Sequence, residues 1–290
     1  MRKALLRMYL RMCSLFIKDK RARREFRDHM KDRIHEKLYK RQKWGVAYSV
    51  FDGEELLEAS VRNIRPHVDY ICVVWQRVSW YGSPVHDEVL PLITKLKEEG
   101  LVNEVLEYEV NLKLKAGRNE TRKRNMGLQA ARKAGCTYFM AMDTDEFYKA
   151  DEIENAKHYL IKHGITHSYC AQTIYGKQPT QMIMATMSCC PFFSRLTYWS
   201  KHQNDPHSVA QADPTRKISH IPWWRGGSRH FFVHQVKMNH FSFIRKDLQR
   251  KIDNSSGENA SEKTQHRLNQ CDILNCPDYF GLHEVMQNFH

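Results

Sequence analysis

Two aspartates stand directly after a short apolar run in the middle of the chain. The run covers residues 138–142, and Asp143, Thr144 and Asp145 follow it. Such a run predicts a buried strand, and ligands of open α/β sheets bind just outside the carboxyl ends of the strands. On a regular strand the side chains of Asp143 and Asp145 would point the same way. Two carboxylates so placed suit Mg²⁺ or Mn²⁺ that bridges to substrate phosphates, although a solvated acidic loop has the same pattern.

The segments around the aspartates alternate between strand-like and helix-like patterns. Buried-strand runs cover 45–51, 69–75, 101–108 and 138–142, and helical spacing of apolar residues covers 54–64, 90–99 and 119–134. This order predicts an α/β fold of Rossmann type, with a mostly parallel sheet and helices on both faces. Asp151, with Glu154 three residues later, is typical of an N-cap and capping box for a helix over 152–163.

The pattern is looser after residue 165. Short apolar pieces alternate with polar turns, and residues 200–230 are rich in His, Arg, Trp, Pro and Gly. We expect this region to build a substrate pocket from loops. A last strand-like stretch covers 236–244, and basic helical sequence follows it to residue 252.

The positive charge of the chain is concentrated at its amino end. The formal net charge is +13, and residues 1–43 carry 16 Lys and Arg against 5 Asp and Glu. The remaining residues, 44–290, hold 30 basic and 28 acidic residues, so the body is nearly neutral. This distribution argues against a nucleic-acid groove across the body, and we expect no nucleic-acid partner.

Residues 1–43 form a basic arm that begins with an amphipathic helix. Most positions of 4–17 are apolar, and Arg7, Arg11, Ser14 and Lys18 recur at helical spacing as one narrow stripe. The segment is too short to span a bilayer, but such a helix can lie in a membrane interface beside anionic head groups. Two interpretations stay open. The arm docks on the inner face of a membrane, or it packs its apolar face on the body or on a partner.

Cysteine usage predicts a reducing compartment. Eight cysteines are present, and none forms a C-x-x-C pair. Several lie in apolar runs, where a free thiol behaves as a small apolar side chain. We therefore expect reduced thiols and a cytoplasmic protein that is peripheral on the inner face of the membrane.

A longer pattern surrounds the two aspartates and resembles a known family. Residues 123–128 read Lys-Arg-Asn-Met-Gly-Leu, Ala130 and Ala131 follow, and 135–145 lead into the acidic pair. This segment resembles the signature of family 2 glycosyltransferases, in which a helix with R-N-x-G-L precedes a strand that ends in D-x-D. Residues 49–57 are similar to that family's first strand and turn. Residues 238–247 and 251–256 resemble a segment of bacterial lipopolysaccharide and surface-polysaccharide transferases, so the resemblance covers most of 44–256.

The resemblance implies a GT-A fold that uses a nucleotide-sugar donor and Mn²⁺ or Mg²⁺. It implies that Asp143, Asp145 and His240 hold the metal. A buried structural role beside Phe241 and Phe243 is the alternative for His240, and His234 and His230 are then the substitute ligands.

The resemblance also implies a set of residues that contact the donor nucleotide. The first turn, with Phe51 and Asp52, faces the base. Arg245 and Lys246 would neutralise the diphosphate as charge develops on it. The family's second acidic motif is missing here, so base recognition would fall to Gln76 or Trp75, and uridine is the default base of this fold. The remaining donor contacts implied are Arg124, Asn125 and Asp143.

Two further roles belong to the loop region. An inverting transfer needs a carboxylate that deprotonates the acceptor hydroxyl, and the candidates are Asp213, which we prefer, and Asp205. Asp213 is followed by Pro214, so a plain Asp-Pro turn is the alternative. Three aromatic side chains would stack on sugar faces or belong to the core: Trp223, Trp224 and Phe231.

The sequence thus predicts a metal-dependent transferase with four regions. Residues 1–43 are the arm, 44–164 the nucleotide-sugar-binding half, 165–256 the acceptor-binding half with the metal and diphosphate segment, and 257–290 a tail. The expected reaction moves a sugar from a nucleotide diphosphate sugar, UDP-sugar by the resemblance, onto a lipid-linked surface glycan such as lipopolysaccharide. The alternatives are an enzyme of phosphate esters, a non-catalytic membrane-anchored module, and a nucleic-acid binder that uses the arm.

Overall fold

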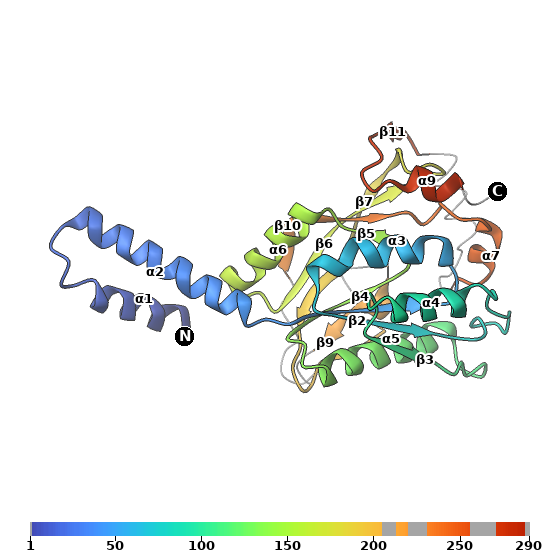
Figure 1. Cartoon of the computed structure of the whole chain (residues 1–290), viewed down its shortest axis with the longest axis horizontal. Coiled ribbons are helices and arrows are strands. Elements are labelled where there is room, and N and C mark those ends of the chain that lie inside the picture. The colour runs from blue at the N-terminus through green and yellow to red at the C-terminus, as the bar shows by residue number, and fades with distance from the viewer. Residues whose placement is uncertain (1, 205–212, 220–230, 256–270, 288–290) are drawn as a thin grey trace.

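The protein consists of an α/β body and a helical hairpin that projects from it (Figure 1). The computed structural model describes residues 2–204, 213–219, 231–255 and 271–287, and all structural statements concern these ranges. The body contains one nine-stranded sheet in the order β3-β2-β1-β4-β7-β6-β10-β5, with β11 paired to β7.

The first four strands are parallel, as the alternating pattern predicts. They are β1 (Trp44–Val50), β2 (Tyr70–Trp75), β3 (Glu104–Glu107) and β4 (Tyr138–Met142). The helices that connect them are α3 (Glu54–Ile64), α4 (Val89–Glu98) and α5 (Ala116–Lys133). The predicted α/β class is confirmed, and the predicted element bounds lie within a few residues of those observed.

Both faces of the sheet are covered. Val46 and Tyr48 on β1 belong to a core that includes apolar residues of α3, α4 and the later helix α6 (Ala150–His163). Ala47, between them, belongs to a separate core with Leu128 and Ala131 of α5. Successive side chains on a strand point to opposite faces, so a strand apolar at every position needs helices on both.

The second half of the sheet is mixed. Only β6 (His167–Tyr175) and β10 (Phe231–His240) pair in parallel there. Antiparallel pairing joins the other strands, which are β7 (Gln181–Arg195), β5 (Glu146–Phe147) and β11 (Ile273–Asn275). A small second sheet contains β8 (Lys201–His202) and β9 (Ile218–Ser219). The predicted parallel arrangement therefore describes the first four strands, and the loosely patterned region supplies antiparallel ones.

The sheet curls around the carboxyl end of β4. Only residues 143–145 separate β4 from β5, yet three strands lie between them in the sheet order. Four inter-strand steps of a flat sheet span about 19 Å, whereas four residue steps of extended chain reach at most ~14 Å. The acidic turn can bridge the two strands only because the sheet is curled.

The capping box predicted at Asp151 is wrong. The helix α6 begins at Ala150, its N-cap is Lys149, and no side chain caps it. Glu154 instead accepts hydrogen bonds from Tyr39 at 2.6 Å and pairs with His67 and Lys157. Because the Glu154 carboxylate makes these contacts, it does not bond to the backbone at the start of the helix as a capping box requires.

The basic arm is a hairpin of α1 (Arg2–Cys13) and α2 (Lys20–Lys40). Leu10 of α1 is buried, but most large apolar side chains nearby are exposed, including Leu5, Met8, Tyr9, Met12, Leu15 and Phe16. The interpretation that these side chains pack on the body is therefore wrong for the described arm. No helix among the described residues has both the length and the apolar character needed to cross a membrane.

Gly127 gives a test of how α5 is seated on the sheet. A Cβ atom there would overlap the methyl group of Ala47 on β1, whereas a Cβ atom at Gly117 would meet only the amide end of the Asn204 side chain. We expect Gly127→Ala to lower the free energy of unfolding by about 1–3 kcal/mol through overpacking. Gly117→Ala, in the first turn of the same helix, is the matched control and should change it by less than about 1 kcal/mol. Urea denaturation of both variants measures this, and an equal effect at the two positions would contradict the close packing.

Candidate functional site

The two aspartates of the D-x-D segment lie in a turn and face different partners. The strand β4 ends at Met142, so 143–145 no longer follow the two-residue alternation of a strand. Asp143 pairs with Arg124 at 3.2 Å and with Arg216, whereas Asp145 pairs with a different set of cations. The prediction that both side chains point the same way is wrong, because the chain leaves the extended conformation one residue too early.

Asp145 is almost fully buried, and its two oxygens have unlike surroundings. Oδ2 accepts hydrogen bonds from Arg245 Nη2 at 2.7 Å and Lys251 Nζ at 2.6 Å. Oδ1 accepts no hydrogen bond and faces His240 Nε2 at 3.4 Å. Burial by itself would raise the pKa of Asp145, but Lys251, His240 and Arg245 outweigh it and hold the pKa well below its usual range. The group is a carboxylate with one unused buried oxygen.

Arg245, the partner of Asp145, has hydrogen-bond donors that are not used. Its side chain is buried, and Nε and Nη1 find no hydrogen-bond acceptor among the described residues. Gly53 permits this placement, because it has a φ of 79° and a Cβ atom there would lie 2.5 Å from Arg245 Nη1. A buried donor without a partner is costly, so a ligand that offers acceptor oxygens beside Asp145 would be stabilised.

Strand pairing brings His240 to the acidic turn. His240 is the register partner of Glu146 across β10 and β5, and the Phe241 amide donates to the Asp145 carbonyl at 2.9 Å. His240 Nδ1 lies 2.6 Å from the side-chain amide of Gln172 on β6. The Gln172 oxygen accepts from Ser188 at 3.2 Å, so the amide nitrogen of Gln172 faces Nδ1, and Nε2 is the His240 atom directed at Asp145. A cation bound at Nε2 would replace the proton there, with the other ring nitrogen held by its neighbour as is typical of histidine ligands.

The residues fit a divalent cation, but not as the set that the resemblance implies. Among the described residues, ligand atoms of Asp145, Glu146 and His240 lie within 4.8 Å of one another, and Asp143 is not in this group. Two carboxylates and an imidazole are a donor set for Mn²⁺ or Mg²⁺. The unused Oδ1 of Asp145 is the atom that favours a cation here.

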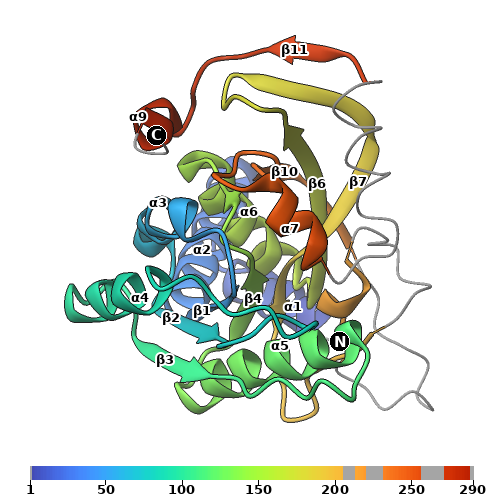
Figure 2. The same ribbon diagram turned by 90° about the vertical axis from the view of Figure 1, so that its right-hand side faces the viewer.

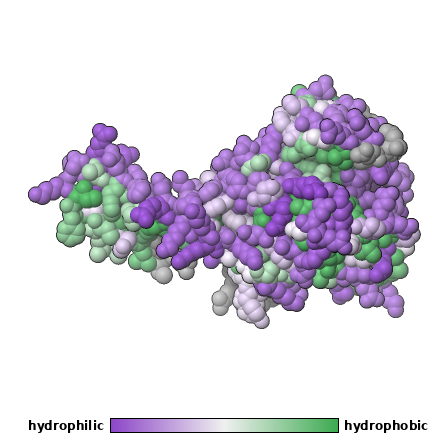
Figure 3. Space-filling view, viewed as in Figure 1, coloured by the Kyte–Doolittle hydropathy of each residue, from purple (hydrophilic) through white to green (hydrophobic). Residues whose placement is uncertain are grey.

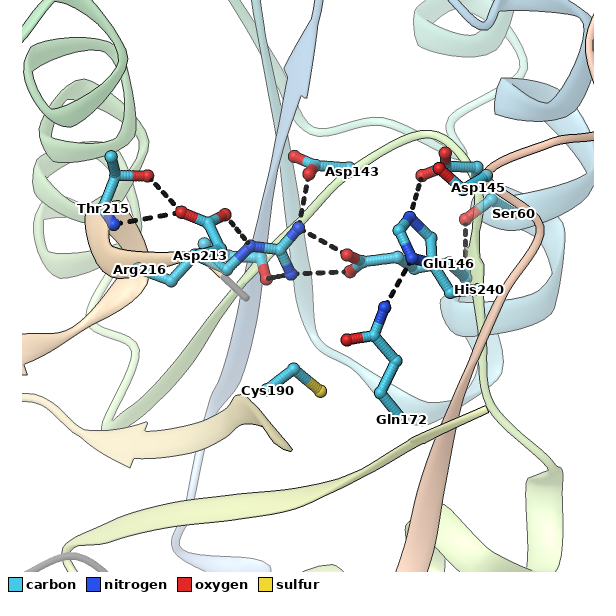
Figure 4. A network of polar contacts seen from close by, with 12 residues as sticks. Ser60, Asp143, Asp145, Glu146, Gln172, Cys190, Asp213, Thr215, Arg216 and His240 are labelled. Carbon is cyan, nitrogen blue, oxygen red and sulfur yellow. Dashed lines mark hydrogen bonds and ion pairs between the residues drawn. The ribbon is translucent and has the colours of Figure 1, made fainter. Parts of the chain in front are cut away.

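Arg216 connects three acids of the site, Asp143, Glu146 and Asp213 (Figure 4). It contacts Asp213 at 2.7 Å and Glu146 at 2.9 Å, and it also pairs with Asp143. Arg124 of α5 binds Asp213 at 2.8 Å from the other side. These contacts join α5, the acidic turn and the short helix η2 (Pro214–Arg216) into one network.

The network separates the proton affinities of its acids. Burial would raise the pKa of Asp213, but Arg124 and Arg216 lower it far below the usual range. Burial raises the pKa of Glu146, and the ion pair with Arg216 offsets this only in part. Asp213 also caps η2, since its Oδ1 accepts from the Thr215 amide at 3.0 Å and from Thr215 Oγ1 at 2.6 Å.

Two of the helix residues expected to contact the donor have structural contacts. Arg124 is buried among Glu120, Asp143 and Asp213. Asn125 bonds the backbone of β8, donating to the His202 carbonyl at 3.1 Å and accepting from its amide at 2.9 Å. Both residues therefore position the elements around the site.

The expected base-binding residues lie at the ends of β1 and β2. Gln76 is buried with both ends of its amide in use, since Nε2 donates to the Val78 carbonyl and Oε1 accepts from Lys123. Phe51 lies under the guanidinium of Arg250, whose carbon is 5.4 Å from the ring centroid. The Asp52 carbonyl accepts from Thr144 at 3.4 Å, which joins the first turn to the D-x-D turn.

Other predicted residues lie elsewhere. Lys246 is exposed, and its amine is 3.6 Å from Glu88, away from the acidic turn. His234 is exposed near the start of β10, and Phe231 is 44% exposed. Four candidates fall outside the described residues: Asp205, Trp223, Trp224 and His230.

Sequence reasoning missed Arg216 and Lys251 as members of the site. Both belong to segments already singled out, around Asp213 and in 251–256, but nothing in their spacing distinguishes them from surface cations. Lys123 was also missed. It is fully buried, donates to the Val50 carbonyl at 2.7 Å, and burial lowers its pKa to about 7.

Comparisons with known proteins give distant structural likenesses. No protein-family model and no curated protein matches the sequence. The crystal structure of S. aureus TarS 1-349 aligns with a TM-score of 0.44 and 13% identity over 69% of this chain and 61% of that chain. Its complex with UDP-GlcNAc aligns with a TM-score of 0.34 and 16% identity over 47% and 35%. GalNAc-T7 with UDP, GalNAc and Mn²⁺ aligns with a TM-score of 0.40 and 10% identity over 77% and 50%.

This chain therefore spans less than two thirds of the length of each of these structures. At these scores the argument for function rests on the residues of the site.

Replacing Arg216 tests the acid network. Arg216→Met leaves Glu146 without its cation, while Arg124 still pairs with Asp143 and Asp213. Breaking a buried ion pair in this way costs about 3–5 kcal/mol of unfolding free energy. Burial already raises the pKa of Glu146, and loss of Arg216 raises this folded-state pKa further above the unfolded value near 4. The loss of stability therefore grows as pH rises above ~4 and is larger at pH 7 than at pH 5. Arg195→Met, at an exposed site, is the control and should change stability by less than about 0.5 kcal/mol. Denaturation at the two pH values measures both, and a loss independent of pH would refute the pairing.

Proposed function

We propose that the protein is a metal-dependent glycosyltransferase, similar to family 2 enzymes with a GT-A fold, that uses a nucleotide diphosphate sugar. One observation carries the proposal. The buried pair of Asp145 and Arg245 leaves an acceptor unused on one partner and donors unused on the other. A ligand that brings a cation and anionic oxygens together would satisfy both, and a metal–diphosphate is such a ligand.

Each residue of the site then has a role. Asp145 and His240 hold the cation, with Glu146 beside them. Such a cation, when bound, would neutralise the negative charge of the leaving nucleotide diphosphate. Arg245 donates its free N–H groups to phosphate oxygens, a charge-assisted contact that strengthens as charge develops there. Asp143 keeps Arg124 and Arg216 in place.

The general base stays a prediction. Asp213 is the residue that the sequence favours, but its ion pairs with Arg124 and Arg216 lower its proton affinity. An efficient base has a pKa near the working pH, so these pairs weigh against it. We retain the proposed division into a donor-binding half at 44–164, an acceptor-binding half at 165–256 and a tail at 257–290.

Substitution of Asp145 tests the proposal. We expect the wild-type protein to bind UDP, the nucleotide that the resemblance implies, only with Mn²⁺ present. Asp145→Asn should weaken this binding more than about 100-fold, since even outer partners of metal ligands cost 10–100-fold. Isothermal titration of a nucleoside diphosphate panel, with and without Mn²⁺, measures it.

Asp151→Asn, an exposed acid in the first turn of α6, is the matched control and should bind normally. Binding that needs no metal, or that survives Asp145→Asn, would sink the proposal. Hydrolysis of phosphate esters without a sugar acceptor would favour a phosphate-ester enzyme instead.

We also propose that the hairpin holds the protein at an anionic membrane surface on the cytoplasmic side, beside a lipid-linked glycan acceptor such as lipopolysaccharide. Phe16 is 92% exposed and Leu15 65% exposed, and residues 1–43 carry the excess basic charge. Figure 3 shows apolar residues gathered on the outer part of the hairpin beside strongly polar ones. Exposed apolar side chains next to cations are typical of helices that lie in a membrane interface.

The placement of the hairpin sets a condition on the acceptor. The hairpin joins the amino end of β1, whereas the site lies at the carboxyl ends of the strands, toward the opposite end of the long axis (Figure 1). The body must therefore lie along the membrane for the site to reach a membrane-bound acceptor.

The double variant Leu15→Ser, Phe16→Ser tests docking. We expect partitioning onto phosphatidylglycerol vesicles to fall at least tenfold, because burying one large apolar side chain is worth about 1.5–3 kcal/mol. Tyr198→Ser removes an aromatic residue of the body that is 79% exposed and should have no effect. Vesicle co-sedimentation at two salt concentrations measures it, and partitioning unchanged by the variant would refute docking. A dimer in solution that the variant dissociates would point to a second copy as the partner.

A further inference from the structure

The short helix α7 (Leu248–Asp253) lies across the carboxyl ends of the strands, and Figure 2 shows it in front of β10 and β6. Asp247 caps it by accepting from the Arg250 amide at 2.8 Å. None of the residues of α7 is buried. Two neighbours on this helix, Arg250 and Lys251, nevertheless reach the candidate site.

Each of the two side chains contacts a residue that binds a ligand in the proposed function. Lys251 Nζ contacts Asp145 Oδ2 at 2.6 Å, so an ammonium already neutralises the proposed metal ligand. The Arg250 guanidinium lies over the ring of Phe51, the residue expected to face the nucleotide base. A cation stands at the proposed metal ligand and a flat cationic group lies against the aromatic ring.

We infer that α7 is a self-inhibitory strap, in which Lys251 and Arg250 compete with the divalent cation and the nucleotide base for Asp145 and Phe51. The inference rests on the proposed function. A divalent cation bound at Asp145 would lie within a few ångströms of the Lys251 ammonium, and like charges so close in a buried site repel strongly. A base cannot stack on the face of Phe51 that the guanidinium covers.

Besides the packing of the partly buried Leu248 on a small apolar cluster that includes Phe243, few contacts hold α7. Lys251 also donates to Ser242, through its carbonyl at 3.0 Å and its hydroxyl at 2.9 Å. Arg250 donates to the Pro84 carbonyl at 2.5 Å, and an open cavity of about 300 Å³ lies between α7 and residues 83–86. A six-residue helix without buried side chains is marginal by itself, so it belongs to the part of the fold that opens locally.

Hydrogen exchange of the wild-type protein is the first test. We expect the backbone amides of 250–254 to exchange at least about fivefold faster when Mn²⁺ and UDP are added, because the strap must leave for both to bind. If exchange is unchanged or slower while Mn²⁺ and UDP do bind, α7 stays in place or closes over the ligand. That result would refute the self-inhibitory strap but leave the proposed function standing.

The variant Lys251→Met is the second test. We expect it to bind Mn²⁺ alone about tenfold more tightly, since one like charge is removed from beside the cation, and to show faster exchange in α7 without any ligand. Gln249→Met places the same side chain on an exposed position of the same helix and should do neither. Weaker Mn²⁺ binding by Lys251→Met would overturn the inference. Failure of wild-type and variant protein alike to bind Mn²⁺ or UDP would defeat the proposed function, and the strap with it.

Discussion

Buried negative charge at the carboxyl ends of the strands is the constraint on which the body depends. Asp143, Asp145 and Glu146 lie within four residues, and Asp145 and Glu146 are almost fully buried. Charges taken out of water must be paired, because the low dielectric of the interior makes an isolated charge very costly. The counter-charges come from α5, η2 and the segment 245–251. Neutralising one short turn thus ties together elements from most of the body.

The cations are distributed unevenly among the acids, and this distribution separates structural carboxylates from one that can bind a ligand. Arg216 pairs with Glu146 and joins it to Asp143 and Asp213. Asp145 accepts hydrogen bonds from two cations on one oxygen, whereas the other oxygen faces His240 without a hydrogen bond. The first group is a structural framework, and the second is a place where a ligand can replace protein contacts. The curl of the sheet allows both to exist side by side, because it brings β10 and His240 to a turn that leaves β4.

The hairpin obeys a different constraint. Its residues carry the excess of positive charge, and its apolar side chains are not used by the body. It joins the body where Tyr39 stacks on His158 with ring centroids 3.8 Å apart and bonds Glu154. Under the proposed function, a nearly neutral body with a cationic, apolar extension would keep membrane attachment apart from the transfer reaction at the far end of the sheet.

Local pattern was enough to predict the α/β class, the first four strands and the helices between them, and the family resemblance implied the meeting of Asp145 with His240. Periodicity reports which side chains are buried, and the D-x-D resemblance names the residues at the strand end. The sequence could not predict that Asp143 and Asp145 face different partners. Nor could it predict that Arg216 pairs with Glu146, 70 residues away, and Lys251 with Asp145, 106 residues away. Those pairings depend on where long, flexible cationic side chains arrive once the sheet has curled, and only the tertiary structure decides that.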